Sequence, residues 1–462
     1  MGSRLPPYPE YRESGLAWLP RVPSHWDVRR NGRLFAQRVE TGREELPILE
    51  VSLRTGVRVR SFGEGDRKQV MADRSKYKRA AAGDVAYNMM RLWQGAVGVA
   101  PEDGLVSPAY VVAAPYDGVD PRYFTYLFRT ADYMREVESF SRGIVADRNR
   151  LYWGQFKQMP SPYPPLEEQR RIADYLDAHG RLTNRLIRNR RRMLAVLKER
   201  RQGIVQDAVA RGLQPSEPMQ RTGLPWLAEV PTRWNRTHVG SHVRVVNGFP
   251  FDSTLFRVGE GLPLVRIRDI FRMQTVVSFA GDPVPEAAID TGDVLVGMDG
   301  DFNVAVWQGG PAMLNQRVCC LRPDARFDRA YLALVMALAL KWVNEQTFST
   351  TVKHLSSTTI RRLRFPAPAV EEQEAIVAAV ERATSAIAAT EKRLRREIGL
   401  VEEYRERLIA DSVTGALDVR TADIAAPLAY GAEDDLALDD EPDGAEDDVG
   451  EDLDAALAEA EE

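Results

Sequence analysis

The apolar positions of this 462-residue chain form patterns that follow one another in a fixed order. Short apolar runs broken by Gly, Asp and Pro come first, at residues 46–52, 85–87, 95–99 and 109–113, and they are typical of strands and turns. A helical stretch at residues 121–139 follows them. Apolar residues then recur at helical spacing over about 44 residues. We predict an α+β domain that is followed by a long helix.

The same order returns in the second half of the chain. Its short apolar runs are residues 264–268, 293–297, 304–307 and 317–321, and its helical stretch is residues 329–346. A second long apolar pattern comes after them. We therefore expect two α+β domains, each closed by a long helix.

Proline and acidic residues mark where each long helix begins. Pro164-Pro165 and the run from Pro366 to Pro368 oppose helix before them and suit the first turn after them. Glu167-Glu168 and Glu371-Glu372 then lie at the positive end of the helix dipole. At ~1.5 Å per residue, a helix of about 44 residues is about 66 Å long.

The apolar positions of the second long helix step alternately by four and three residues from Ile376 to Leu394, and continue after a stutter to Leu408. This is the seam of a coiled coil. The first helix is less regular, and Gly180 weakens it near its start. Because neither seam is stable in water alone, we predict an antiparallel coiled coil that holds the two domains at a fixed distance. The predicted seam residues are Ile172, Leu176, Leu182, Ile187, Leu194, Leu197, Ile376, Val380, Ile387, Leu394, Ile398, Val401 and Leu408.

The two halves also repeat residue by residue. The segment Ser14-Gly-Leu-Ala-Trp-Leu-Pro-Arg-Val-Pro-Ser-His-Trp26 returns as Thr222-Gly-Leu-Pro-Trp-Leu-Ala-Glu-Val-Pro-Thr-Arg-Trp234, at an offset of 208. Gly83-Asp-Val aligns with Gly292-Asp-Val at an offset of 209. Such a period lies above the range of stacked solenoid repeats, so it indicates two copies of a whole domain. A molecule built in this way is expected to meet a partner that has two sites.

These landmarks divide the chain into five predicted segments. They are a first domain over residues 1–163, its helix over 164–221, a second domain over 222–367, its helix over 368–420 and a tail over 421–462.

Charge separates the tail from the rest. The net charge of the whole chain is −5. The segment after Arg420 has 17 acidic residues and no Lys or Arg, so residues 1–420 have 50 acidic and 62 basic residues and are basic overall. The composition of the tail is typical of a disordered segment. We favour a solubilising extension. The alternative is a shield that keeps stray nucleic acid from the basic surface until the right target displaces it.

Several classes of protein are disfavoured. No run of about 18 apolar residues exists, and the N-terminus lacks the apolar stretch of a signal peptide, so a cytoplasmic protein without a membrane segment is expected. Cys319 and Cys320 are adjacent in an expected strand, and with the five histidines they show no metal-ligand spacing. A core or edge position is favoured for them over a redox role.

Basic and amide side chains suggest a nucleic-acid reader. A basic segment from Arg54 to Arg79 precedes the segment Asn88-Met-Met-Arg-Leu-Trp-Gln-Gly95, in which Asn and Gln match the adenine edge and Arg matches guanine. The alternative is that Trp93 and the methionines are core residues and that Asn88 caps a turn. The first long helix is also rich in Arg, beyond what solubility requires, although a solvated helix face explains it too.

The second domain offers a matching place at residues 297–307 and 315–317. Asp299-Gly300 is a turn signal, so a bare hairpin tip competes with a reader. Asp299 and Asp301 suggest a metal, but too few further ligands follow. A third pair of segments, 141–150 and 350–357, aligns in the repeat and differs in side chains, so we expect two different half-sequences to be read.

The candidate DNA-contacting residues are Arg54, Arg58, Arg67, Lys68, Lys76, Lys78, Asn88, Arg91, Trp93, Gln94, Arg142, Arg148, Arg150, Arg266, Arg268, Asp301, Asn303, Asn315, Gln316, Arg317, Lys353, His354 and Ser356.

Catalytic motifs are missing from the sequence. It has no phosphate-binding G-x-x-x-x-G-K-[ST] loop, no G-x-G-x-x-G, no H-E-x-x-H and no Asn-Pro-Pro-aromatic motif of amino-methyltransferases. No set of nucleophile, base and orienting residue is evident. We therefore expect a non-catalytic protein without a catalytic or metal site.

From about Tyr11 to Arg420 the chain resembles the DNA specificity subunit of a type I restriction-modification enzyme. The resemblance is carried by the repeated Gly-x-x-Trp-Leu-x-x-Val-Pro-x-x-Trp motif, the run from Asp84 to Gly98, Pro165-Leu-Glu-Glu-Gln with its helix, and the closing Asp411-Ser-Val-Thr-Gly-Ala-Leu-Asp-Val-Arg. In combination these motifs are specific. The acidic tail is not part of the pattern.

The resemblance implies two target recognition domains that each read one part of a split, asymmetric site in double-stranded DNA, as part of a phage-defence system. The helices would set the unread spacer and dock two adenine-N6 methyltransferase subunits, which use S-adenosylmethionine. Restriction subunits, which use ATP and Mg, would join for cleavage, and this chain would bind no cofactor itself. The alternative is a coiled-coil scaffold whose two domains bind proteins.

Overall fold

The computed structural model describes residues 5–53, 55–60, 74–141, 150–214, 216–346 and 353–424. The chain divides into two compact units, which we call unit 1 (Met1–Arg190 with Arg396–Glu462) and unit 2 (Arg191–Arg395). Each unit holds one α+β domain and a part of each of two long helices. None of the helices within these ranges is long and apolar enough to span a membrane.

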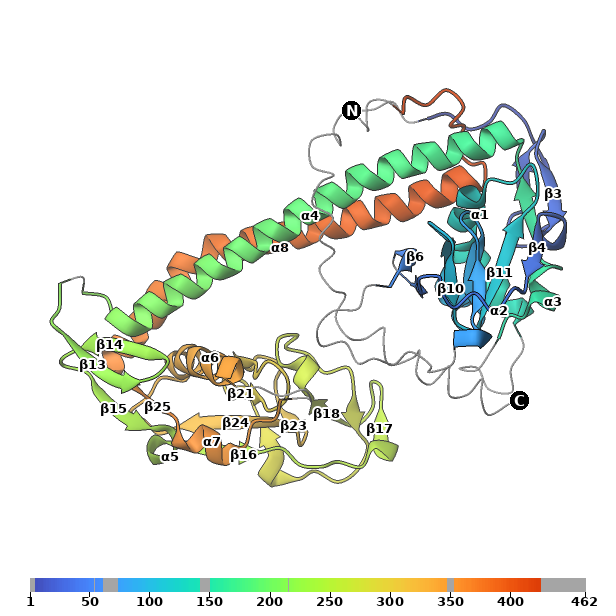
Figure 1. Cartoon of the computed structure of the whole chain (residues 1–462). Coiled ribbons are helices and arrows are strands. Elements are labelled where there is room, and N and C mark those ends of the chain that lie inside the picture. Colours follow the sequence, from blue (N-terminus) through green and yellow to red (C-terminus); the bar gives the residue numbers. More distant parts are fainter. Residues whose placement is uncertain are drawn as a thin grey trace. The chain divides into compact units, whose positions relative to one another are not determined.

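The domain of unit 1 is built on a four-stranded antiparallel sheet (Figure 1). Its strands, in spatial order, are β4 (Phe35–Arg38), β11 (Tyr110–Pro115), β8 (Val85–Asn88) and β9 (Val97–Val99). Further strands pair in twos: β1 (Tyr11–Glu13) with β2 (Arg21–Pro23), β3 (Asp27–Arg30) with β12 (Pro160–Tyr163), β5 (Leu49–Ser52) with β6 (Gly56–Val59), and β7 (Lys78–Ala80) with β10 (Gly104–Val106). The helices of the domain are α1 (Pro121–Phe128), α2 (Ala131–Phe140) and α3 (Trp153–Phe156).

Both faces of this sheet are buried. Val85 and Tyr87 of β8 belong to a core with α1 and α2, whereas Ala86 between them belongs to a second core with Leu49 and Val51. This follows because successive side chains of a strand point to opposite faces of the sheet. A strand that is buried on both faces reads as a short continuous apolar run, which is the pattern in the sequence.

Unit 2 repeats this sheet. Its strands, in spatial order, are β16 (Val243–Asn247), β24 (Val318–Pro323), β21 (Val294–Gly297) and β22 (Val304–Val306). The register repeats as well, since Ala86 pairs with Val112 in unit 1 and Leu295 pairs with Cys320 in unit 2. The duplication seen in the sequence is therefore a duplication of the fold.

The second face of the sheet differs between the units. Unit 2 covers it with a five-stranded sheet of β17 (Phe256–Arg257), β19 (Ser278–Phe279), β18 (Leu262–Val265), β23 (Ala312–Leu314) and β20 (Ala288–Ile289). The other elements of its domain are β13 (Met219–Leu224), β14 (Leu227–Pro231), β15 (Asn235–His238), β25 (Arg364–Ala367), α5 (Val239–His242), α6 (Arg329–Gln346) and α7 (Ser357–Arg362). Helix α6 spans the predicted residues 329–346 without a break.

Several predicted elements are shorter or interrupted in the structure, and three of them differ most. The strand expected at 264–268 ends at Val265, because the Asp269 carboxylate accepts from the Arg266 N–H and starts a 3-10 turn. The helix expected at 121–139 is broken where the Thr130 side chain caps α2. The strand expected at 46–52 begins only at Leu49.

The two long helices are α4 (Leu166–Arg211, 46 residues) and α8 (Val370–Val413, 44 residues), and α4 runs through Gly180 without interruption. In unit 1, Arg190 Nε donates to Glu397 Oε2 at 2.8 Å and Arg405 Nη1 donates to Asn184 Oδ1 at 3.0 Å, so here the helices lie side by side and antiparallel. Each of the thirteen predicted seam residues is buried or half-buried.

Candidate nucleic-acid interface

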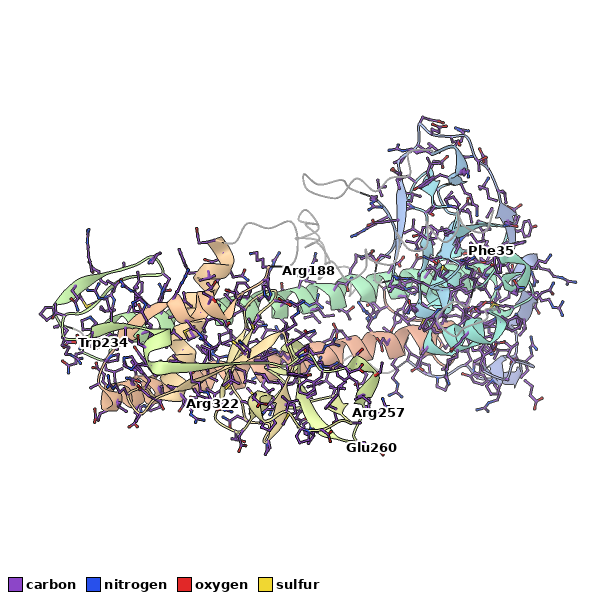
Figure 2. The ribbon with its side chains drawn as sticks, turned by 90° about the horizontal axis from the view of Figure 1, so that it is seen from below. Phe35, Arg188, Trp234, Arg257, Glu260 and Arg322 are labelled. Carbon is purple, nitrogen blue, oxygen red and sulfur yellow. The ribbon has the colours of Figure 1, made fainter. Side chains whose placement is uncertain are left out.

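The motif repeated at the start of each half fixes its domain to the start of a long helix. Trp26 Nε1 donates to Glu168 Oε1 at 3.0 Å in unit 1, and Trp234 Nε1 donates to Glu372 Oε2 at 3.0 Å in unit 2. Both indoles are almost fully buried. Trp234 is marked in Figure 2. These repeated residues therefore build the frame of the domain.

A glutamine completes each of these joints. Gln169 Oε1 accepts from the Asp120 N–H at 2.9 Å, and its Nε2 donates to Pro164 O at 2.8 Å. Gln373 makes the equivalent bonds with the Asp328 N–H and with Pro368 O, both at 2.9 Å. Both glutamines are fully buried, so all their hydrogen-bonding capacity serves the fold.

The repeated Gly-Asp-Val motif is structural too. The Asp84 carboxylate accepts from Arg38 Nε at 2.6 Å, and that of Asp293 accepts from Arg322 Nη2 at 2.6 Å. Burial opposes the charge on Asp293, but hydrogen bonds from Arg322 and from a backbone N–H outweigh it and lower the pKa of this carboxyl. Figure 2 marks Arg322 on β24.

Three loops meet at the end of the sheet in unit 2, and we call this place tip 2 (residues 297–303, 315–317 and 353–356). The Met298 N–H donates to Arg317 O at 2.9 Å, and the Leu355 N–H donates to Met298 O at 2.7 Å. A third bond joins the Gly300 N–H to Lys353 O at 3.1 Å. Two of these three backbone bonds join residues that are more than 50 positions apart in the sequence.

One carboxylate organises the side chains of tip 2. Asp299 Oδ1 accepts from His354 Nδ1 at 2.7 Å, and Asp299 Oδ2 lies 3.3 Å from Arg317 Nε. The Asp299 side chain is 19% exposed, whereas those of Arg317 and His354 are 54% and 53% exposed. Lys353 Nζ donates to Asn344 O at 2.7 Å beside them. Cationic and imidazole groups thus face solvent around a partly buried anion.

The other predicted residues of unit 2 surround this cluster. The 3-10 turn with Arg266 and Arg268 lies next to it, because the Asn315 N–H donates to Val265 O at 3.0 Å. Arg266 is engaged by Asp269, and Ser356 Oγ caps α7 by accepting from the Thr359 N–H. The remaining predicted side chains lie at the surface in different degrees: Arg268, Asp301 and Gln316 are exposed, and Asn303 and Asn315 are half-buried.

The same backbone pattern recurs in unit 1, at what we call tip 1 (residues 89–94, 107–109 and 150–151). The Met89 N–H donates to Ala109 O at 3.3 Å, and the Leu151 N–H donates to Met89 O at 2.8 Å. These are the counterparts of the bonds made by Met298 and Leu355. The polar side chains are different.

Two predicted DNA-contacting residues, one at the end of β8 and one in tip 1, instead make hydrogen bonds within the domain. Asn88 is 3% exposed, and its Oδ1 accepts from the Met90 N–H at 2.8 Å, which is the turn-capping interpretation. Trp93 packs partly against the core, and its Nε1 donates to Met90 O at 2.8 Å. Arg91 is half-buried and Gln94 exposed, and these two remain as surface candidates.

The basic segment of unit 1 has mixed placements. Lys78 Nζ donates to Pro108 O and Tyr110 O at 2.7 and 2.8 Å, and burial lowers the pKa of this amine. Arg58 pairs with Glu50, whereas Lys76 is exposed and Arg150 half-buried. Five predicted residues lie outside the described residues, namely Arg54, Arg67, Lys68, Arg142 and Arg148. The tail from residue 425 onward also lies outside them.

The sequence-based candidates did not include Asp299. Its signal was the Asp-Gly pair of a hairpin turn, which says nothing of a histidine 55 positions away. Within the described residues, no group of three or more His, Cys, Asp or Glu side chains is placed to hold a metal ion.

Comparison with known proteins identifies the family. The model of the type I restriction modification DNA specificity domain matches residues 70–194 and, a second time, residues 241–399, which together are more than half of the chain. The two matched stretches fall in the two halves of the internal repeat.

Two curated relatives are similar. The type I restriction enzyme EcoBI specificity subunit of Escherichia coli is 34% identical over 194 residues, which is 41% of this chain and 41% of that protein. The putative type I restriction enzyme MjaX specificity subunit of Methanocaldococcus jannaschii is 20% identical over 312 residues, or 66% of this chain and 69% of that protein.

A solved structure shares the fold. It was described as the structural basis underlying complex assembly and conformational transition of the type I R-M system, and its chain matches with a TM-score of 0.56 at 18% identity. The match covers 86% of this chain and 99% of that one. The family model matches this chain twice, and the two matches together cover more than half of the chain. The chain therefore belongs to the family of type I restriction-modification DNA specificity subunits, with two recognition domains in tandem.

Proposed function

We propose that this chain reads a split, asymmetric sequence in double-stranded DNA, with one half-site for each domain. One observation carries the proposal beyond family membership: the two domains share a backbone frame but differ at the tips. Tip 2 has Asp299, Arg317 and His354 where tip 1 has Met90, Ala109 and Arg150. Base readout depends on the donors and acceptors presented to the groove, so different tips suit different half-sequences.

The long helices are proposed to form an antiparallel coiled coil that sets the unread spacer. Support comes from burial of the predicted seam and from contacts within each unit. In unit 1, Ile172 and Leu176 of α4 share a core with Leu408 of α8, and in unit 2 Val209 of α4 shares a core with Ile376 of α8.

The partners are proposed from the family. Two adenine-N6 methyltransferase subunits that use S-adenosylmethionine would dock on this chain, and restriction subunits that use ATP and Mg would join them. This chain would supply specificity and no catalysis. The sequence shows none of the phosphate-binding or methyltransferase motifs that such chemistry requires.

Methylome sequencing tests the reader role. A host that expresses this chain with its neighbouring methyltransferase gene is compared with the same host without this chain. We expect N6-methyladenine at one split motif, which gives both half-sites and the spacer length. If the complex assembles and no new motif appears, the chain is a scaffold for protein partners.

A matched pair of deletions tests the spacer. Removal of residues 193–199 from α4 and 388–394 from α8 takes one heptad from each helix, close to the same level of the pair. At ~1.5 Å per residue each helix shortens by about 10 Å, or about 3 base pairs of B-DNA. We expect a spacer shorter by about that number and unchanged half-sites. An unchanged spacer in an assembled complex would exclude the helices as its ruler.

A further inference from the structure

We infer that Asp299 is a positioning residue which fixes what Arg317 and His354 present to DNA, so that Arg317 recognises a guanine and His354 accepts from an exocyclic amino group of a neighbouring base. The inference rests on the proposed function, because it names the chemistry by which the second domain reads its half-site. It assigns a specificity role to a carboxylate that does not itself contact a base.

The geometry of the cluster is the first support. Asp299 Oδ1 accepts from His354 Nδ1 at 2.7 Å, and Oδ2 lies 3.3 Å from Arg317 Nε. Each of the three residues lies on a loop whose backbone is fixed by the hydrogen bonds of tip 2. A partly buried anion that holds two exposed side chains from different loops restricts their rotamers before DNA arrives, which lowers the entropic cost of binding.

The Arg317 guanidinium is oriented so that its two terminal Nη groups are available to a base. Its Nε faces Asp299, and the part of the chain that the structure describes gives no partner to the two terminal Nη groups. The side chain is 54% exposed. Two parallel N–H donors match the O6 and N7 acceptors of guanine in the major groove, and no other base offers that pair there.

The imidazole of His354 has the opposite polarity. With Nδ1–H directed to the Asp299 carboxylate, the neutral ring keeps a lone pair on Nε2, which then accepts a hydrogen bond. An acceptor suits the amino groups of cytosine N4 and adenine N6, and it opposes the carbonyl oxygens of guanine and thymine. Through its two contacts, Asp299 thus leaves Arg317 with a pair of donors and His354 with an acceptor facing the DNA.

Tip 1 offers no equivalent. Met90 stands where unit 2 has Asp299, and Ala109, which is 6% exposed, stands where it has Arg317. The first half-site therefore serves as an internal control, because changes at tip 2 should leave it intact.

The experiment is methylome sequencing of hosts that express the full complex with variants of this chain. We expect the wild-type motif to contain a fixed guanine in the second half-site. Arg317→Ala and Arg317→Lys should relax that one position, with discrimination reduced about 10- to 100-fold, because a lysine keeps the charge but not the fork. His354→Ala should relax a neighbouring position at which cytosine or adenine is fixed.

Variants of Asp299 separate positioning from simple charge. Asp299→Ala should relax both positions, whereas Asp299→Asn keeps an acceptor for His354 Nδ1 and should relax the guanine position more than the other. Arg257→Ala is the matched control: it removes a cation from β17, outside tip 2, and should leave the motif unchanged (Figure 2). Thermal unfolding of each purified complex checks that the variants fold.

Three results would overturn the inference. One is a uniform fall in methylation by the folded Asp299→Ala and Arg317→Ala variants with every position of the motif kept, which would make the cluster only a loop clamp. The second is relaxation of the first half-site. The third is a wild-type second half-site without a fixed guanine. Absence of any motif with wild-type protein would instead refute the proposed function.

Discussion

The two domains are alike where each joins the start of its long helix, which we call the helix joint, and they are different at the tip. At the helix joint, Trp26 and Trp234 donate to equivalent glutamates, and the bonds are 3.0 Å long in both cases. At the tips the backbone bonds recur, but Asp299 of tip 2 is replaced by Met90 in tip 1. A duplicated domain therefore keeps the side chains that hold its frame and changes those that face solvent. Side chains that the repeats share need not be the readers.

A smaller difference lies at the helix joint itself, in the second partner of each glutamate. His25 Nε2 lies 2.8 Å from Glu168 Oε2 in unit 1, whereas Arg233 pairs with Glu372 at the same place in unit 2. Both glutamates are 14% exposed or less. The frame accepts either side chain because both offer a donor to the same carboxylate.

The largest expected effect tests whether the two helix joints, with Trp26 in unit 1 and Trp234 in unit 2, are equivalent. Trp26→Ala and Trp234→Ala each leave a large cavity and remove one hydrogen bond to a largely buried glutamate, so each should destabilise its own unit by about 3–5 kcal/mol. Urea unfolding of the purified chain, followed in each unit by hydrogen exchange, measures the loss. Trp→Phe variants are the control and should lose less. A large loss at only one of the two positions would contradict the equivalence.

Removal of the glutamines is the next test. Gln169→Ala and Gln373→Ala each delete buried hydrogen bonds to backbone groups, which then lack a partner, and each should cost about 1–3 kcal/mol. The same unfolding measurement applies. Neither variant should alter the methylated motif of a folded complex, and an altered motif would show that the frame also takes part in readout.

Tip 1 has its own test. Arg91→Ala and Gln94→Ala remove two of the surface candidates of tip 1, so they should relax the first half-site by up to about tenfold and leave the second alone. Methylome sequencing measures both halves at once. Relaxation of both halves together would contradict the assignment of one half-site to each domain.

The smallest effect concerns the strands that carry the two tips. Cys319 and Cys320 stand where unit 1 has Val111 and Val112, and all four are buried. Burial raises the pKa of each thiol to about 12, so the thiols stay protonated and should resist iodoacetamide in the native protein at mildly alkaline pH. Cys319→Val and Cys320→Val should change stability by less than about 1.5 kcal/mol. Rapid native alkylation, measured by mass spectrometry, would contradict this placement.

The sequence by itself determined the duplication, several strands of the two main sheets and the two long helices. Those features are local or repetitive: strands buried on both faces read as apolar runs, proline and acid mark helix starts, and residues 329–346 form helix α6 as predicted. The resemblance to specificity subunits rested on the same repeated motifs, and the family model matches both halves.

Only the tertiary structure decided which polar residues form the tips. Asn88 matched a reader by composition, but the fold turns it inward to cap a turn at Met90. Asp299 looked like a plain turn residue, but strand pairing and a returning loop bring Arg317 and His354 to its carboxylate. Turn propensity depends on near neighbours, whereas a cluster of this kind depends on strand register and on loops that close far along the chain.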